Sequence, residues 1–156
     1  MAAVLPKFPI DKYKISEPLG QGAFGNVISY TLHQTDDTLP DIVAMKIFQP
    51  RNVSNFYKEK DIMEALMANH HPNIVRCFGI CQLARRQHAL VYEVFDIDLM
   101  EYMLKKDTYI SNLETKNILY PIANALEHMK KVKTVHRDVK PENVLLKLSD
   151  GETKVL

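Results

Sequence analysis

The sequence predicts an α+β fold in which a strand-rich part, residues 13–93, precedes a mostly helical part, residues 99–156. The first part is predicted because runs of β-branched and aromatic residues recur between turn signals, with one helical segment among them. The second part is predicted from apolar residues that recur at helical spacing, namely Ile118, Ile122, Leu126 and Met129. We therefore expect a five-stranded sheet with one helix, followed by helices.

Size, charge and cysteine content narrow the classes of function. The 156 residues suffice for one domain, and 20 basic against 19 acidic side chains leave a net charge of +1. We expect neither a nucleic acid nor a membrane as partner, because basic side chains are not in excess and the apolar run before Pro6 is too short to span a bilayer. Cys77 and Cys81 lack zinc-site or redox spacing, so we expect free thiols in an intracellular protein, cytoplasmic or nuclear.

Residues 136–143, His-Arg-Asp-Val-Lys-Pro-Glu-Asn, bring an acid, a base and an amide close together. Asp138 can accept a proton from an attacking hydroxyl, Lys140 can offset charge on a phosphoryl group, and Asn143 can offer a side-chain oxygen to Mg²⁺. The alternative is a charged surface loop, which an isolated His-Arg-Asp would favour. The full pattern favours a catalytic loop.

Three glycines punctuate residues 20–27, Gly-Gln-Gly-Ala-Phe-Gly-Asn-Val. Residues without a Cβ let backbone amides close over a phosphate without steric cost. A dinucleotide-binding turn would use the same glycines but needs a helix directly afterwards. Residues 27–31 are rich in β-formers instead, which favours a flap of two strands over a phosphate.

Lys46 lies in the apolar run 42–48, where strand alternation places it on the same face as Ala44 and Phe48. A cation on a half-buried face needs an anionic partner, and a phosphate with a carboxylate would supply it. The alternative is a lysine that extends into solvent from an edge strand.

The carboxylate is expected from a helix over residues 54–67, with Ser54 as its N-cap. Glu59 and Glu64 compete for the role. Helical spacing places Glu59, and not Glu64, on the face of three apolar residues, Ile62, Met63 and Leu66. We therefore predict that Glu59 pairs with Lys46.

In order along the chain, these four segments resemble the glycine-rich loop, the V-A-I-K strand, the C-helix and the H-R-D-L-x-x-x-N catalytic loop of eukaryotic protein kinases. Met45 replaces isoleucine in the second motif, and Val139 replaces leucine in the fourth. A lysine two residues after Asp138 is typical of the serine/threonine type. The resemblance covers residues 13–156.

The resemblance implies a protein kinase-like two-lobed fold after an N-terminal extension, residues 1–12. Its N-lobe, residues 13–93, would hold a five-stranded antiparallel sheet and the C-helix. A hinge over residues 94–98, similar in its shortness to that of cyclin-dependent and MAP kinases, would lead into an incomplete helical C-lobe, residues 99–156.

A hairpin is expected around residues 149–151, between strands at 144–147 and 153–156. In the family, Asp-Phe-Gly follows such a hairpin, and its aspartate holds Mg²⁺. We therefore expect a truncated kinase domain that is inactive by itself.

Residues 91–99 resemble the hinge region itself. Tyr92 would occupy the gatekeeper position. The backbone of Glu93 and Phe95 would hydrogen-bond adenine, and Asp98 would face the ribose. Taken without the resemblance, the same run is a strand end followed by a helix start.

The resemblance implies ATP and Mg²⁺ as cofactors. The residues implied to bind them are Leu19, Gly20, Gln21, Gly22, Ala23, Phe24, Gly25, Val27, Ala44, Lys46, Glu59, Tyr92, Glu93, Phe95, Asp98 and Leu145. The implied catalytic residues are Asp138, Lys140 and Asn143, and Asn143 is also the implied metal ligand.

The implied activity is ATP-dependent phosphoryl transfer to serine or threonine hydroxyls of a protein substrate, with a regulatory protein as a further partner. Two alternatives stay open. The chain could be a non-catalytic nucleotide-binding or decoy fragment, or an incomplete gene product that barely folds.

Two residues stand out in the helix expected over residues 112–132. Pro121 removes the hydrogen bond to the Asn117 carbonyl and should kink the helix at a cost of about 3 kcal/mol. His128 has no second ligand beside it in sequence, so we expect a histidine on the helix surface.

Overall fold

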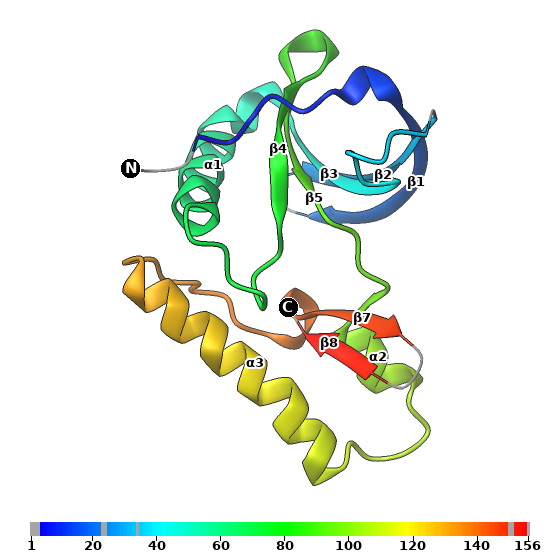
Figure 1. The fold of residues 1–156 in the computed structure, drawn as a ribbon, viewed down its shortest axis with the longest axis vertical. Helices are drawn as coiled ribbons and strands as arrows, with labels where there is room; N and C mark the ends of the chain where they lie inside the picture. The colour runs from blue at the N-terminus through cyan, green and yellow to red at the C-terminus, as the bar shows by residue number, and fades with distance from the viewer. Residues whose placement is uncertain (1–3, 23–24, 34, 150–151, 156) are drawn as a thin grey trace. The chain divides into compact units, whose positions relative to one another are not determined.

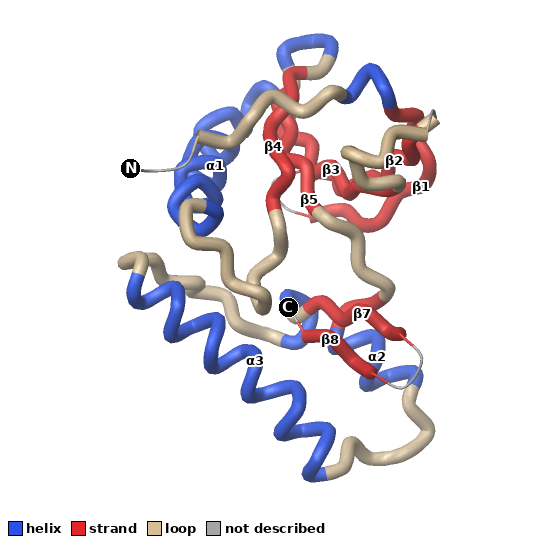
Figure 2. The backbone as a smooth tube through the Cα atoms, in the orientation of Figure 1, coloured by secondary structure: helices blue, strands red, loops and turns tan. Residues whose placement is uncertain are grey.

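The computed structural model describes residues 4–22, 25–33, 35–149 and 152–155 (Figure 1). The chain forms two compact units. The first unit comprises Met1–Asn69 and Arg76–Val94, and the second comprises His70–Val75 and Phe95–Leu156. Each unit has its own sheet, drawn in red in Figure 2.

The first unit contains the expected five-stranded antiparallel sheet, whose strand order is β1-β2-β3-β5-β4. The strands are β1 (Tyr13–Gly22), β2 (Gly25–Leu32), β3 (Ile42–Phe48), β4 (Cys77–Gln82) and β5 (His88–Tyr92). Pro18 interrupts the register of β1, which is tolerated because β1 is an edge strand.

Strand alternation gives the sheet of the first unit two different faces. One face carries Val43, Met45 and Val91, all fully buried, in a core with Phe8 and Tyr30. Residues at the intervening positions, such as Lys46, therefore point to the opposite face.

Helix α1 (Val53–Met67) packs on the first unit's sheet, and its buried residues are Phe56, Met63 and Leu66. Two expectations for it were wrong. A 3-10 turn over Pro50–Asn52 runs directly into the helix, so Ser54 lies inside the first turn and is not the N-cap. Ile62 is 43% exposed, because it lies about 100° around the helix from Met63 and so misses the buried stripe.

The N-terminal segment adds backbone pairing at the free edge of β4. The Phe8 N–H donates to the Ile80 carbonyl at 2.8 Å, and the Ile80 N–H donates to the Pro6 carbonyl at 2.9 Å. Leu5 and Phe8 are each only 4% exposed. Part of the expected N-terminal extension therefore belongs to the fold of the first unit.

The second unit holds helices α2 (Leu99–Lys105) and α3 (Asn112–Lys131), where apolar spacing predicts helices over residues 99–106 and 112–132. Its three-stranded sheet has the order β6-β7-β8, with bounds Ile97–Asp98, Leu145–Ser149 and Glu152–Val155, and includes the expected hairpin. The buried cluster consists of Leu99, Ile118, Val144, Leu146 and Val155.

Helix α3 begins with a capping box, in which Ser111 and Glu114 each accept from the other's backbone N–H. Pro121 lies inside this helix. Figure 1 draws α3 as one continuous helix. Proline has no N–H to donate, so Pro121 leaves the Asn117 carbonyl without its helical donor. Asn117 is exposed, so water can take the donor's place.

Among the described residues, no helix combines the length and apolarity needed to cross a bilayer.

The expectation of a surface histidine at position 128 was wrong. His128 is half-buried, and its ring centroid lies 5.1 Å from that of His71. His71 precedes α3 by more than 40 residues in the sequence, so spacing along the chain could not reveal this contact.

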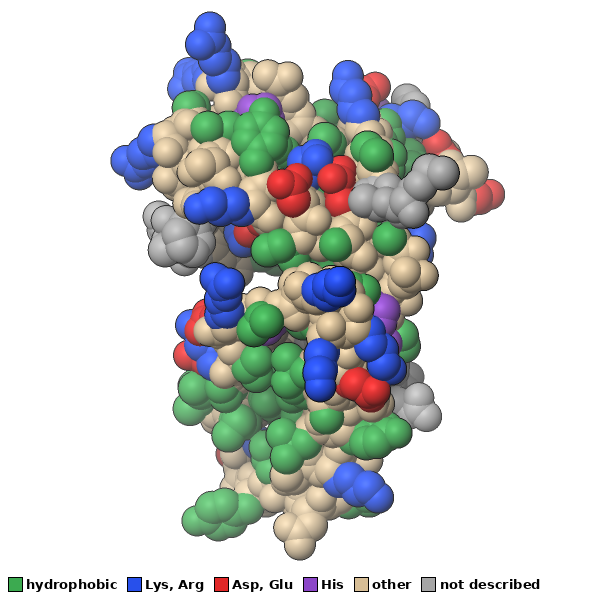
Figure 3. All heavy atoms as spheres, turned by 90° about the vertical axis from the view of Figure 1, so that its left-hand side faces the viewer, with side chains coloured by type: hydrophobic (Ala, Val, Ile, Leu, Met, Phe, Trp, Pro, Cys, Tyr) green, Lys and Arg blue, Asp and Glu red, His purple; other side chains and the backbone are tan. Residues whose placement is uncertain are grey.

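Hydrophobic side chains also gather on a face of the second unit (Figure 3). The large apolar residues that α3 exposes are Leu113, Leu119, Tyr120 and Leu126. Helix α3 therefore buries only part of its apolar surface.

Candidate active site

Lys46 on β3 and Glu59 on α1 form an ion pair in the first unit. The Lys46 Nζ lies 2.8 Å from Glu59 Oε1 and 2.6 Å from Oε2, and the two side chains are only 28% and 27% exposed. The same Nζ lies 5.4 Å from the centre of the Phe48 ring, as expected for residues on one face of β3. Glu64 instead pairs with Lys60 at 2.8 Å. The structure thus brings together Lys46, which strand alternation selected, and Glu59, which helical spacing selected.

Tyr92, at the end of β5, contacts the same carboxylate. Its hydroxyl donates to Glu59 Oε1 at 2.8 Å. Burial and the negative charge of Glu59 raise the pKa of the Tyr92 phenol well above its usual value, so the hydroxyl stays protonated. Sequence reasoning placed Tyr92 beside the nucleotide but missed this hydrogen bond, because the register that sets Tyr92 opposite Ala44 is not visible in the sequence.

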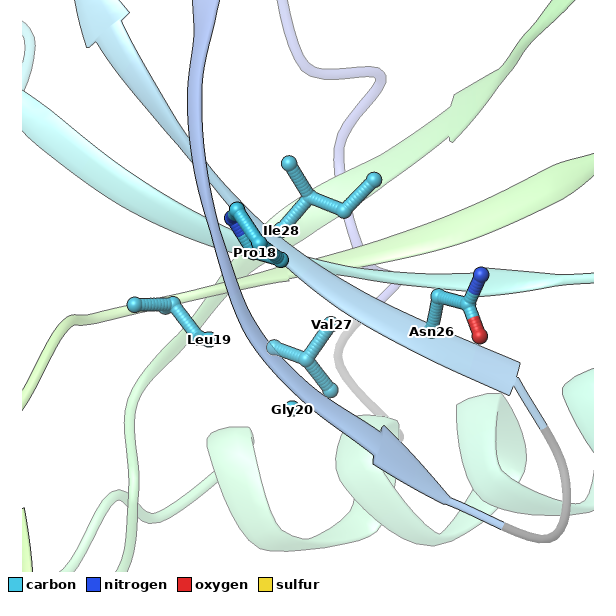
Figure 4. A pocket seen from close by; sticks show the side chains of 6 residues that line it. All are labelled: Pro18, Leu19, Gly20, Asn26, Val27 and Ile28. Atoms are coloured by element: carbon cyan, nitrogen blue, oxygen red, sulfur yellow. The ribbon is translucent and has the colours of Figure 1, made fainter.

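The predicted glycine flap is built from β1 and β2, which pair Gly20 with Val27 and Gly22 with Gly25. A pocket of about 350 Å³ lies here, lined by Pro18, Leu19, Gly20, Asn26, Val27 and Ile28 (Figure 4). Leu19, Gly20 and Val27 are therefore brought together as expected. The side chain of Gln21 and residues 23–24, Ala23 and Phe24, lie outside what the structure describes.

The flap's glycines differ in what surrounds them. A Cβ at Gly25 would overlap the backbone carbonyl of Ile47, so the approach of β2 to β3 requires glycine there. A Cβ at Gly20 would meet nothing within 4 Å. Gly20 thus has no packing reason to be glycine, whereas Gly25 has one.

The residues predicted to contact adenine and ribose belong partly to the first unit and partly to the second. In the first unit, Ala44 is buried, and the Glu93 N–H donates to the Arg76 carbonyl at 3.1 Å. The Glu93 Oε1 in turn accepts from the Arg76 N–H at 2.6 Å. These bonds occupy the amide and side chain of Glu93 and leave its carbonyl as the group that could accept from a ligand.

In the second unit, Phe95 is half-buried, and Asp98 is the N-cap of α2. The Asp98 Oδ1 accepts from the Glu101 N–H at 2.7 Å. Asp98 thus has the structural role of a helix start, and contact with a ribose stays a prediction. Leu145 is half-buried on β7 between the buried Val144 and Leu146.

The predicted catalytic residues form one cluster in the second unit. Asn143 donates its Nδ2 to the Asp138 carbonyl at 2.8 Å and to Asp138 Oδ2 at 2.9 Å, while the Lys140 Nζ lies 3.4 Å from that Oδ2. A 3-10 turn over Pro141–Asn143 returns the amide to Asp138. The pKa of Asp138 is lowered, chiefly by the hydrogen bond from Asn143 and to a smaller extent by Lys140. The carboxylate is 64% exposed, ionised and able to accept a proton.

The backbone of this loop is unusual at Arg137. Its φ of 69° lies in the left-handed region that favours glycine. The next N–H, that of Asp138, donates to His136 Nδ1 at 3.3 Å. Unfavourable backbone conformations of this kind concentrate at functional sites.

Asn143 fits the role of a magnesium ligand in part. Its amide nitrogen is engaged with Asp138, and its other polar atom, Oδ1, is of the kind that Mg²⁺ prefers as a ligand. Within the described ranges, no group of three or more His, Cys, Asp or Glu residues could hold a metal ion. The role of Asn143 as a magnesium ligand stays a prediction.

Comparison with known proteins matches residues 13–156 to the protein kinase domain. The Aurora kinase of Saccharomyces cerevisiae is 28% identical over 91% of this chain and 39% of its own length. Aurora kinase B of Mus musculus is 30% identical over 95% of this chain and 42% of its own length. A titin homolog of Caenorhabditis elegans is 32% identical over 93% of this chain and 1% of its own length.

The chain belongs to the protein kinase family. It spans about two-fifths of the length of the Aurora kinases that it matches. The similarity to cyclin-dependent and MAP kinases stays a prediction.

Proposed function

We propose that this chain is part of a domain that transfers the γ-phosphate of ATP to serine or threonine hydroxyls of protein substrates, with Mg²⁺. The observation that carries the proposal is the Lys46–Glu59 ion pair, because a fixed cation on a half-buried face suits the recognition of phosphates. Membership of the protein kinase family supports it.

The first unit would hold the nucleotide. Lys46, oriented by Glu59, would contact the α- and β-phosphates. The flap over residues 20–27 would cover them, and the open space at Gly20 leaves room for a ligand. Ala44 and Val27 would contact adenine, and the family pattern implies the same contact for Leu145.

The second unit would act on the substrate hydroxyl. The Asp138 carboxylate, kept ionised by its lowered pKa, would accept the hydroxyl proton. Lys140 would offset negative charge on the moving phosphoryl group, and it favours a serine or threonine substrate by family pattern. Mg²⁺, when bound, neutralises phosphate charge, and Asn143 would be one of its ligands.

We also propose an intracellular location, cytoplasmic or nuclear, because both cysteines are free thiols, which are typical of reducing compartments. Cys77 and Cys81 are buried free thiols, and burial raises the pKa of each to about 11. Thiols with such pKa values are poor nucleophiles, so neither cysteine has a place in the proposed chemistry.

Because the 156 residues are expected to be inactive by themselves, the proposal is tested on a longer protein that contains them, by transfer of labelled phosphate from Mg·ATP to serine- and threonine-containing peptides. We expect Asp138→Asn to lower the rate on the order of 10²- to 10⁴-fold. Transfer that survives this substitution would exclude Asp138 as the base. Binding of Mg·ATP without transfer would favour the alternative, a non-catalytic nucleotide-binding protein.

A further inference from the structure

We infer that the Tyr92 hydroxyl is a positioning group, which fixes Glu59 and through it holds Lys46 ready for phosphates. The inference rests on the proposed function and assigns to Tyr92 a task beyond lining an adenine pocket. Three elements meet at the Glu59 carboxylate: β3 supplies Lys46, α1 supplies Glu59, and β5 supplies Tyr92.

The carboxylate accepts three hydrogen bonds. Its Oε1 takes one from the Lys46 Nζ and one from the Tyr92 hydroxyl, each at 2.8 Å, and its Oε2 takes a second from Lys46 at 2.6 Å. One oxygen is thus shared between the cation and the phenol. Two donors from neighbouring strands hold the carboxylate more firmly than Lys46 alone could.

The sheet register explains why the phenol reaches this oxygen. Tyr92 pairs with Ala44 across β3 and β5, while Lys46 pairs with Leu90. Tyr92 and Lys46 are therefore diagonal neighbours on one face of the sheet, the face that carries the Lys46–Glu59 pair. Both donors belong to the sheet, whereas the acceptor belongs to the helix.

Any shift of α1 that removes Glu59 from Lys46 also removes the acceptor of Tyr92. The phenol is desolvated, so water does not readily replace that acceptor. Its raised pKa keeps the proton on the hydroxyl beside the carboxylate, and Lys46 and Cys77 are the other ionisable groups near it. The hydroxyl thus favours the arrangement in which Lys46 and Glu59 are paired.

Tyr92→Phe isolates this effect, because phenylalanine fills the same space without the donor. The measurement is calorimetric affinity for Mg·ATP and for adenosine on the 156-residue chain. We expect Tyr92→Phe to weaken ATP roughly three- to tenfold, the range of one hydrogen bond, and to leave adenosine unchanged. Adenosine has no phosphate for Lys46 to contact, so it reports on the pocket alone.

Two further variants make the outcome specific. Tyr13→Phe removes a hydrogen bond of 2.6 Å to the Pro40 carbonyl elsewhere in the first unit, and it should change neither affinity. In a Lys46→Gln background, Tyr92→Phe should cause no further loss of ATP affinity, because the group that it positions is gone.

Three results would overturn the inference. Unchanged ATP affinity in Tyr92→Phe contradicts it and leaves the proposed function standing. Equal losses for ATP and adenosine would make Tyr92 a pocket-lining residue only. Absence of ATP binding by the unmodified chain would instead overturn the proposed function, and the inference with it.

Discussion

Asn143 holds Asp138 with a single amide nitrogen, which donates at 2.8 Å to the backbone carbonyl and at 2.9 Å to the carboxylate. The amide fixes the orientation of the carboxylate and favours its charged form. The candidate base and the candidate metal ligand are therefore one structural element.

Replacing Asn143 should remove both hydrogen bonds that it donates to Asp138. We expect Asn143→Ala to raise the pKa of Asp138 toward its ordinary value, because the hydrogen bond from Asn143 is the largest cause of the lowering. Carboxyl chemical shifts followed by NMR against pH measure this pKa. Glu142→Gln, at an exposed neighbour, is the matched control and should leave the pKa lowered. An unchanged pKa in Asn143→Ala would show that the contact is not made in solution.

The glycines of the flap should respond differently to alanine. Gly25→Ala should lower the free energy of unfolding by about 1–3 kcal/mol, because the added Cβ overlaps the Ile47 carbonyl. Gly20→Ala should leave stability nearly unchanged, since the space around Gly20 is open. Urea unfolding followed by circular dichroism compares the two. Equal stabilities would mean that Gly25 is not needed for strand packing.

The N-terminal segment should contribute to stability. Phe8 is 4% exposed, and its ring centroid lies 5.1 Å from that of Tyr13. We expect Phe8→Ala to lower the free energy of unfolding by about 3 kcal/mol, through lost burial and the cavity left behind. Val4→Ala, at a residue that is 81% exposed, is the control and should have no effect. Should both variants unfold at the same urea concentration as the unmodified chain, the segment is not packed on β4.

The start of α3 should be sensitive to acid. Hydrogen bonds from Lys106 and from Ser111 lower the pKa of Glu114 from 4.5 to about 2. A lowered pKa means that the stabilisation is present above pH 4.5 and is lost as the pH falls toward about 2. Thermal unfolding at a series of pH values should show this loss, and Glu114→Gln should reduce it. A pH dependence identical in both proteins would contradict the role of Glu114.

Most of the fold could be predicted from local pattern. Alternating β-formers located the strands of the first unit, and apolar spacing located α2 and α3 to within a residue. The pairing of residues 6–8 with β4 could not be predicted, because it depends on backbone hydrogen bonds to a strand about 70 residues away. Spacing from Glu59 alone could not show that Ile62 is exposed, because the centre of the buried stripe lies at Met63 and Leu66.

The candidate site could be predicted where its residues lie close together in the sequence. Asp138, Lys140 and Asn143 lie within six residues, so a single turn brings them together. The choice of Glu59 needed only the helical period. The Tyr92–Glu59 bond joins a strand to a helix across 33 residues, and no local pattern encodes it. The alternative interpretation of residues 91–99, a strand end followed by a helix start, describes Asp98, whose side chain caps α2 by accepting from the Glu101 N–H.

The central claim is that Lys46, held by Glu59, recognises the phosphates of ATP. Titration calorimetry of the 156-residue chain with Mg·ATP tests it most directly, with Lys46→Ala as the variant and circular dichroism to verify its fold. The account predicts measurable binding that Lys46→Ala weakens by about 10- to 100-fold, as expected for loss of a charged hydrogen-bond donor. No binding by the unmodified chain, or equal affinity in a folded Lys46→Ala variant, would contradict it.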